Sequence, residues 1–153
     1  MSARRNRSKR PSDGSKRSPP QPEEFTLYLD ENLCNSAAIL ETLKTIGVRC
    51  EQHLTHFARG VPDETWLPLV GRNGWVLLTT DKQLRYNFLE RRALRKNAVR
   101  EFVFACGNMS GQEMAEALAL AVPRMRKFCR RFAPPFVAAI TRKGEVHSRW
   151  PRK

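Results

Sequence analysis

The stretch Phe25-Thr-Leu-Tyr-Leu-Asp30-Glu31-Asn32-Leu33 shows how the chain is organised. Its first five residues are mostly apolar or aromatic, which is typical of a short buried strand. Two carboxylates and an amide follow the strand, and a helical pattern begins directly after them. Because open α/β sheets bind their ligands at the carboxyl ends of the strands, we expect Asp30 and Glu31 to lie where such a fold places its chemistry.

Strand and helix patterns alternate from this stretch to near the end of the chain. We expect strands at residues 25–29, 48–53, 75–80, 100–105, 136–141 and 145–148, and helices at 33–46, 63–72, 83–95 and from 110 to about 133. Gly47 should end the first helix, and Ser110 with Glu113 should form a capping box at the start of the last one. This order predicts an α/β protein with three α/β/α layers, a mostly parallel central sheet and a C-terminal antiparallel β-hairpin.

The composition favours one basic domain with a basic arm. The chain has 153 residues, 41% of them hydrophobic, and a formal net charge of +13. Residues 1–22 hold seven bases and Asp13 as the single acid, so we expect a disordered arm there and a folded domain at residues 23–150. The rest of the chain still has 21 bases and 14 acids, and this excess favours a nucleic-acid partner.

Other features of the sequence indicate where in the cell the protein is located. No window approaches 18 consecutive apolar residues, so we expect no membrane span, and residues 1–22 lack the apolar segment of a secretory signal. The four cysteines are widely spaced and form no C-x-x-C pair. We therefore expect reduced thiols and a cytoplasmic location.

Two histidines, His53 and His56, are expected in a loop after the second strand. A histidine pair three residues apart can bind zinc, but no cysteine or third histidine stands at a suitable spacing. Ordinary hydrogen bonds or a contact with a phosphate are therefore the expected roles of these two side chains.

Three aspartates lie at or beyond the carboxyl ends of predicted strands, namely Asp30, Asp63 and Asp81. Asp63 and Asp81 both precede predicted helices, so each alone could be an N-cap. Together, clustered carboxylates favour a cation among them, and hard oxygen ligands select Mg²⁺ or Mn²⁺. Such an ion can bridge a phosphodiester and activate water.

Further side chains could complete this acidic site. Additional acids are Glu31, Glu64 and Glu90, of which Glu90 could instead pair with a neighbouring base. Thr79 and Thr80 could orient water or a phosphate oxygen. The residues expected to hold an RNA backbone are Thr79, Thr80, Lys82, Arg85, Arg91, Arg92 and Arg95.

These motifs resemble the PIN-like domains related to VapC-type toxins. The resemblance covers about residues 25–148 and rests on the ordered set Leu29-Asp30-Glu31-Asn32-Leu33, Gly60-x-x-Asp63-x-x-Trp66, Gly74-Trp75-Val76-x-x-Thr79-x-Asp81-Lys82, Glu90, Phe102-Val-Phe104 and Pro134-Pro135-Phe136. It implies a three-layer α/β/α fold and an Mg²⁺- or Mn²⁺-dependent ribonuclease, often the toxin of a toxin–antitoxin pair. The metal-binding acids of the family correspond to Asp30, Asp63 and Asp81.

One departure from the family pattern keeps other functions open. Many PIN nucleases have an acid after the fourth strand, whereas this chain has Cys106-Gly-Asn108-Met. Either Glu90, Glu31 or Asn108 completes the site, or the chain is a non-catalytic RNA-binding module. A phosphoacceptor signalling domain is a third reading, but no lysine follows the fourth strand to support it. An antitoxin and a second copy of the chain are the expected protein partners.

Overall fold

The computed structural model describes residues 25–80, 88–105 and 107–151. The predicted arm at residues 1–22 lies outside these ranges, as do the candidate site residues Asp81, Lys82 and Arg85. Glu90 lies within a described helix, but its side chain is outside the description.

The centre of the protein is one six-stranded sheet with the strand order β2-β1-β3-β4-β5-β6. Its strands are β1 (Thr26–Leu29), β2 (Arg49–Gln52), β3 (Val76–Thr79), β4 (Arg100–Phe104), β5 (Phe136–Ile140) and β6 (Val146–Trp150). All neighbouring strands run parallel except the β5–β6 pair. The predicted parallel sheet and the antiparallel C-terminal hairpin are both confirmed.

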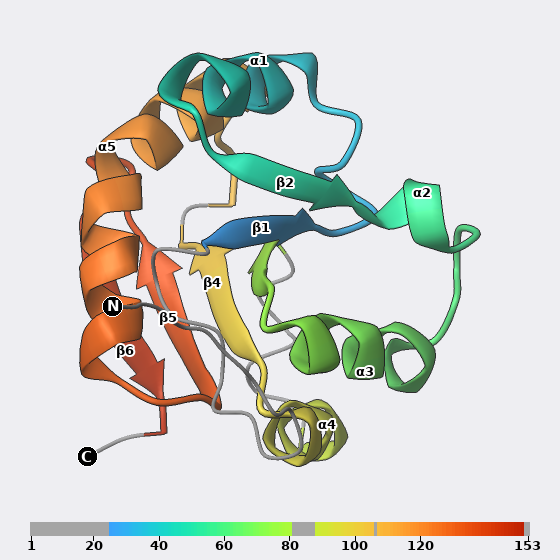
Figure 1. Ribbon diagram of the computed structural model, residues 1–153. Helices are drawn as coiled ribbons and strands as arrows, with labels where there is room; N and C mark the ends of the chain where they lie inside the picture. The colour runs from blue at the N-terminus through green and yellow to red at the C-terminus, as the bar shows by residue number, and fades with distance from the viewer. Residues whose placement is uncertain (1–24, 81–87, 106, 152–153) are drawn as a thin grey trace, which may run out of the picture.

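Helices cover both faces of this sheet (Figure 1). Helices α1 (Ala37–Ile46) and α5 (Gly111–Arg131) pack together on one face, and α3 (Asp63–Asn73) and α4 (Phe88–Asn97) pack together on the other. A four-residue helix, α2 (His53–His56), follows β2. Along β1, β3, β4 and β5, alternate residues belong to two separate apolar clusters, one under each helical layer. The predicted three-layer α/β/α fold is therefore confirmed.

The helix ends show why several boundaries could be read from the sequence. Gly47 caps α1 in the left-handed conformation, with φ of 74°, as expected. At α5, the Glu113 backbone N–H donates to Ser110 Oγ at 3.1 Å and the Ser110 N–H donates to Glu113 Oε1 at 2.8 Å. The predicted capping box is therefore present, and its hydrogen bonds lower the pKa of Glu113.

Other boundaries differ from the predicted ones. Helix α1 begins at Ala37 rather than near Leu33, because Ser36 supplies the N-cap and the preceding residues form turns. Residues 53–56 form α2 rather than a loop. Asp63 is the first residue of α3 and not its N-cap, a position that Pro62 occupies. These corrections affect the residues that surround the candidate site.

The packing of α3 against α4 depends on one glycine. A Cβ atom at Gly71 would lie 1.9 Å from the backbone oxygen of Asn97, so no larger residue fits without moving a helix. This close approach determines how α3, which begins at Asp63, packs against α4.

Candidate functional site

A pocket of about 200 Å³ opens at the carboxyl ends of β1 and β3, on the side covered by α3. Its lining residues come from four separate segments and are Asp30, Glu31, Asn32, His53, Val61, Asp63, Trp66, Leu77 and Thr79. Two of the three predicted aspartates therefore line one pocket. The third, Asp81, follows β3 in the sequence but lies outside the described residues.

The carboxylate of Asp30 is held in a fixed orientation. Its Oδ1 atom accepts hydrogen bonds from the backbone N–H groups of Asn32 and Leu33, each at 3.0 Å. Its Oδ2 atom accepts a hydrogen bond from the Thr79 hydroxyl on the neighbouring strand β3. Only 7% of Asp30 is exposed, so these bonds stabilise a nearly buried carboxylate at the floor of the pocket.

Glu31 and Asp63 form a second side of the pocket. Glu31 Oε1 accepts a hydrogen bond from the Gly60 N–H at 3.0 Å, and Oε2 lies 3.7 Å from Arg59 Nη1. These contacts tie the segment before α3 to the end of β1. Asp63 is half-buried in the first turn of α3, where the positive end of the helix dipole favours a carboxylate.

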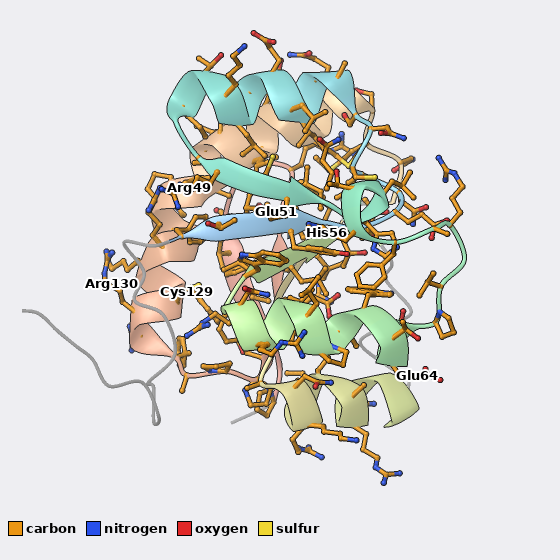
Figure 2. All side chains as sticks on the ribbon, turned by 45° about the vertical axis from the view of Figure 1, so that its right-hand side comes forward. Arg49, Glu51, His56, Glu64, Cys129 and Arg130 are labelled. Atoms are coloured by element: carbon orange, nitrogen blue, oxygen red, sulfur yellow. The ribbon has the colours of Figure 1, made fainter. Side chains whose placement is uncertain are left out.

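Glu64, the neighbour of Asp63, lies differently. Its side chain is exposed and is not part of the pocket lining. Figure 2 labels it at the outer end of α3. Of these two adjacent acids, the structure therefore places the predicted principal acid, Asp63, in the pocket lining and the possible additional acid, Glu64, outside it.

His53 is a pocket residue that sequence reasoning did not identify. Its ring is 1% exposed, and its Nδ1 atom lies 2.7 Å from the hydroxyl of Tyr28. Its Nε2 atom is buried and makes no hydrogen bond to the part of the chain that the structure describes. Burial lowers the pKa of His53, although Glu31, Asp63 and the Ala58 backbone act in the opposite direction.

Tyr28 explains how the His53 ring is held. Its ring stacks nearly parallel to both Trp66 and Trp75, with centroid distances of 5.6 and 5.8 Å, and meets His53 edge-on. Burial is the main cause that raises the pKa of the Tyr28 phenol, so its hydroxyl stays protonated. The sequence did indicate where Tyr28 lies. Because side chains two residues apart in an extended segment point to the same side, Tyr28 lies on the same side of the sheet as Asp30.

The pocket has the donor chemistry that a divalent cation requires. Asp30 and Asp63 offer carboxylate oxygens, and Glu31 lines the same space. Within residues 25–80, 88–105 and 107–151, no three His, Cys, Asp or Glu side chains lie close enough together to hold a metal ion. The described residues thus fit part of an Mg²⁺ or Mn²⁺ site, to which Asp81 is the predicted third acid.

The other predicted contact residues differ in burial and position. Thr79 is 2% exposed and its hydroxyl donates to Asp30, whereas Thr80 is half-buried next to it. On α4, Arg92 and Arg95 are exposed and Arg91 is half-buried. Arg95 also lies over the Trp150 ring, 5.4 Å from its centroid. Asn108 is exposed and does not line the pocket.

Comparison with known proteins identifies the family. The PIN-like domain family matches residues 26–106, which carry β1 to β4 and the whole pocket. The chain therefore belongs to the PIN-like domain family, as the resemblance in its motifs predicted.

One similar curated protein comes from Mycobacterium tuberculosis (strain ATCC 25618 / H37Rv) and is described as a candidate ribonuclease, VapC45. The two are 21% identical over 118 residues, which cover 74% of this chain and 84% of the relative. No solved structure matches the chain. The comparisons thus show membership of the PIN-like domain family and a distant similarity to one VapC ribonuclease.

Two further expectations can be compared with the structure. Cys34, Cys50 and Cys129 are free thiols, as predicted. Among the described helices, none combines the length and apolar character needed to cross a membrane.

Proposed function

We propose that this protein is a metal-dependent endoribonuclease that cleaves single-stranded or structured RNA in the cytoplasm, as the toxin of a type II toxin–antitoxin pair. The observation that supports it most is the pairing of an oriented Asp30 with Asp63 in one pocket at the carboxyl edge of the sheet. Membership of the PIN-like family and the VapC relative point to the same chemistry.

Each residue of the pocket has a distinct role in this proposal. Asp30 and Asp63 would hold Mg²⁺ or Mn²⁺ together with Asp81, and the ion would supply charge stabilisation and a more acidic water. Thr79 fixes the direction of the Asp30 carboxylate by donating to Oδ2. Glu31 holds the segment that leads to Asp63, through Gly60 and Arg59.

The basic side chains would keep a polyanion near this acidic pocket. Arg92 and Arg95 are exposed on α4, which forms the same helical layer as α3. With Arg91, and with Lys82 and Arg85, they form the proposed RNA-binding set. Their contacts to phosphates would be sequence-independent and sensitive to salt.

The direct test is cleavage of a fluorescent single-stranded RNA with Mg²⁺, with Mn²⁺ and with EDTA. Wild type should cleave only with a divalent ion, and Asp30→Asn should not cleave while still binding RNA. Glu41→Gln makes the same chemical change at an exposed position on α1 and is the matched control. Equal cleavage by Asp30→Asn and Glu41→Gln would refute the proposal.

A second candidate function is a PIN-like module that binds RNA without cleaving it. The observation that favours it is the absence of an acid in Cys106-Gly107-Asn108-Met109, directly after β4. This alternative predicts RNA binding with no cleavage under any divalent ion. The same assay therefore separates the two functions.

A further inference from the structure

Arg100 is a buried arginine at the opposite edge of the sheet from the acidic pocket. It is the first residue of β4 and is paired in register with Val76 of β3 and Phe136 of β5. Only 8% of the residue is exposed. Alternation along β4 places its side chain on the same face as Phe102 and Phe104, which is the face that α5 covers.

The protein provides no counter-charge for this guanidinium in the part that the structure describes. Its Nε atom is buried without a hydrogen-bond partner, and none of the ion pairs formed by the described residues includes Arg100. The adjacent carboxylate, Glu101, belongs to the other face of the strand because side chains alternate. Burial lowers the pKa of Arg100.

The titratable group that interacts electrostatically with Arg100, Cys129, does not supply the missing negative charge. Cys129 on α5 interacts electrostatically with both Arg100 and Arg130. Burial nevertheless raises the pKa of the Cys129 thiol to about 11, so it carries no negative charge at neutral pH. Arginine stays protonated in proteins, and a buried charge is costly unless it is paired. A bound anion would offset this cost, so the arrangement favours an anion from outside the described chain.

The surroundings of Arg100 would attract such an anion. Arg130 is exposed beside Cys129, and Arg49 is exposed at the start of β2. Figure 2 shows Arg49, Cys129 and Arg130 on the side of the molecule where β1 and β2 begin, whereas His56 and Glu64 lie where these strands end. Among the described residues, exposed arginines therefore lie at this edge, whereas the carboxylates of Asp30, Glu31 and Asp63 line the pocket at the other.

We propose that the amino-terminal edge of the sheet contains a phosphate-binding site centred on Arg100, with Arg130 contributing to its positive field. The ligand class is a phosphate group, either the free ion or a phosphodiester of RNA. The planar guanidinium can donate two parallel hydrogen bonds to such a group, which a lysine cannot do. The site is independent of the acidic pocket and of any cleavage.

The test uses the full chain and inorganic phosphate. Phosphate binding should be measured by calorimetry at constant ionic strength, and thermal unfolding should be followed with and without phosphate. We expect saturable binding with a dissociation constant on the order of 1 mM. In Arg100→Met the affinity should fall at least about tenfold, because the bidentate donor is lost. Arg72→Met, at an exposed arginine on α3, should bind phosphate like wild type.

The unfolding temperature provides a second test, because a purely structural role for Arg100 predicts a different result. Without phosphate, Arg100→Met should unfold at the same temperature as wild type or higher, because an apolar side chain removes the unpaired buried charge. Arg100→Lys keeps the charge but loses the paired N–H donors of the guanidinium. It should therefore bind phosphate weakly and remain less stable than Arg100→Met. Unchanged phosphate affinity in Arg100→Met, or no saturable binding in wild type, would overturn the proposal.

A binding experiment with RNA distinguishes the source of the phosphate. Binding of a fluorescent single-stranded oligonucleotide should be compared in wild type and Arg100→Met, with EDTA present to prevent cleavage. A weaker complex in Arg100→Met, together with competition by inorganic phosphate, assigns the site to a phosphodiester. Unchanged RNA affinity with lost phosphate binding assigns it to the free anion. Both results support a phosphate site at Arg100.

Discussion

At the carboxyl edge of the sheet, the buried carboxylate of Asp30 accepts two backbone N–H bonds and one hydroxyl bond. At the amino edge, the Nε atom of the buried Arg100 has no partner in the described chain. Both side chains begin or follow parallel strands of the same sheet, and both are less than 9% exposed. The difference shows that burial alone does not define a role, because one charge is held by the fold and the other is left for a ligand.

The comparison predicts the largest effect for the acid that the fold holds. Asp30→Asn keeps the size of the side chain but removes the charge that a cation needs, so cleavage should fall at least about 100-fold. Single-turnover cleavage of a fluorescent RNA, with binding measured separately, checks this. A variant that cleaves normally would remove Asp30 from the site.

A similar contrast separates the neighbours Asp63 and Glu64. Asp63→Asn should reduce cleavage at least about tenfold, because its carboxylate faces the pocket. Glu64→Gln should change cleavage less than about twofold, since its side chain is exposed away from that space. The same RNA assay tests both. The reverse ranking would mean that the pocket has been assigned to the wrong acid.

Thr79→Val tests whether the Asp30 carboxylate needs its hydroxyl donor. The variant keeps the shape of the side chain but removes a buried hydrogen bond, so it should lower the free energy of unfolding by about 1–2 kcal/mol. Cleavage should fall about tenfold, with a larger effect on kcat than on KM, because Asp30 loses its orientation. Chemical denaturation and steady-state kinetics provide the two measurements. Unaltered kinetics together with lower stability would limit Thr79 to a structural role.

Tyr28→Phe tests the support of His53. The substitution keeps the stacked ring but leaves the buried Nδ1 atom of His53 without its partner, at a cost of about 1–3 kcal/mol in unfolding free energy. His56→Gln, at an exposed histidine on the same short helix, should cost less than about 0.5 kcal/mol. Denaturant unfolding compares the two. Similar small effects would show that the Tyr28–His53 bond contributes little.

The lowered pKa of His53 predicts a small pH effect on stability. The folded protein binds a proton on this ring less readily than the unfolded chain, whose histidine pKa is about 6.5. The stabilising contribution is therefore present above that pH and is lost as the pH falls below it. In metal-free buffer, wild type should lose more stability than His53→Gln between pH 7.5 and pH 5.5, values chosen on either side of that pKa. Identical pH profiles would contradict the lowered pKa.

Local patterns in the sequence were sufficient to predict the architecture of the fold. The apolar strand at Trp75–Thr80, the glycine at the end of α1 and the Ser110–Glu113 capping box each act over a few residues, and each was found close to its predicted position. The start of α1 was missed because turns around Asp30 occupy residues that also fit a helical pattern.

The site was predicted only in part, because its key contacts join distant segments. Thr79 and Asp30 are 49 residues apart, and Tyr28 and His53 are 25 apart. Strand-end position identified Asp30 and Asp63 as neighbours, since parallel strands gather their carboxyl ends. No local signal indicated that His53 would be buried while His56, three residues later, would pair with Glu51 at the surface.

The most direct test of the account is Mn²⁺ binding to the full chain, measured by calorimetry and electron paramagnetic resonance without RNA. The account predicts a saturable Mn²⁺ site that both Asp30→Asn and Asp63→Asn weaken at least about tenfold, with an effect in the double variant smaller than the sum of the two in free energy. Mn²⁺ affinity that neither substitution changes would contradict a shared cation site at the carboxyl edge of the sheet.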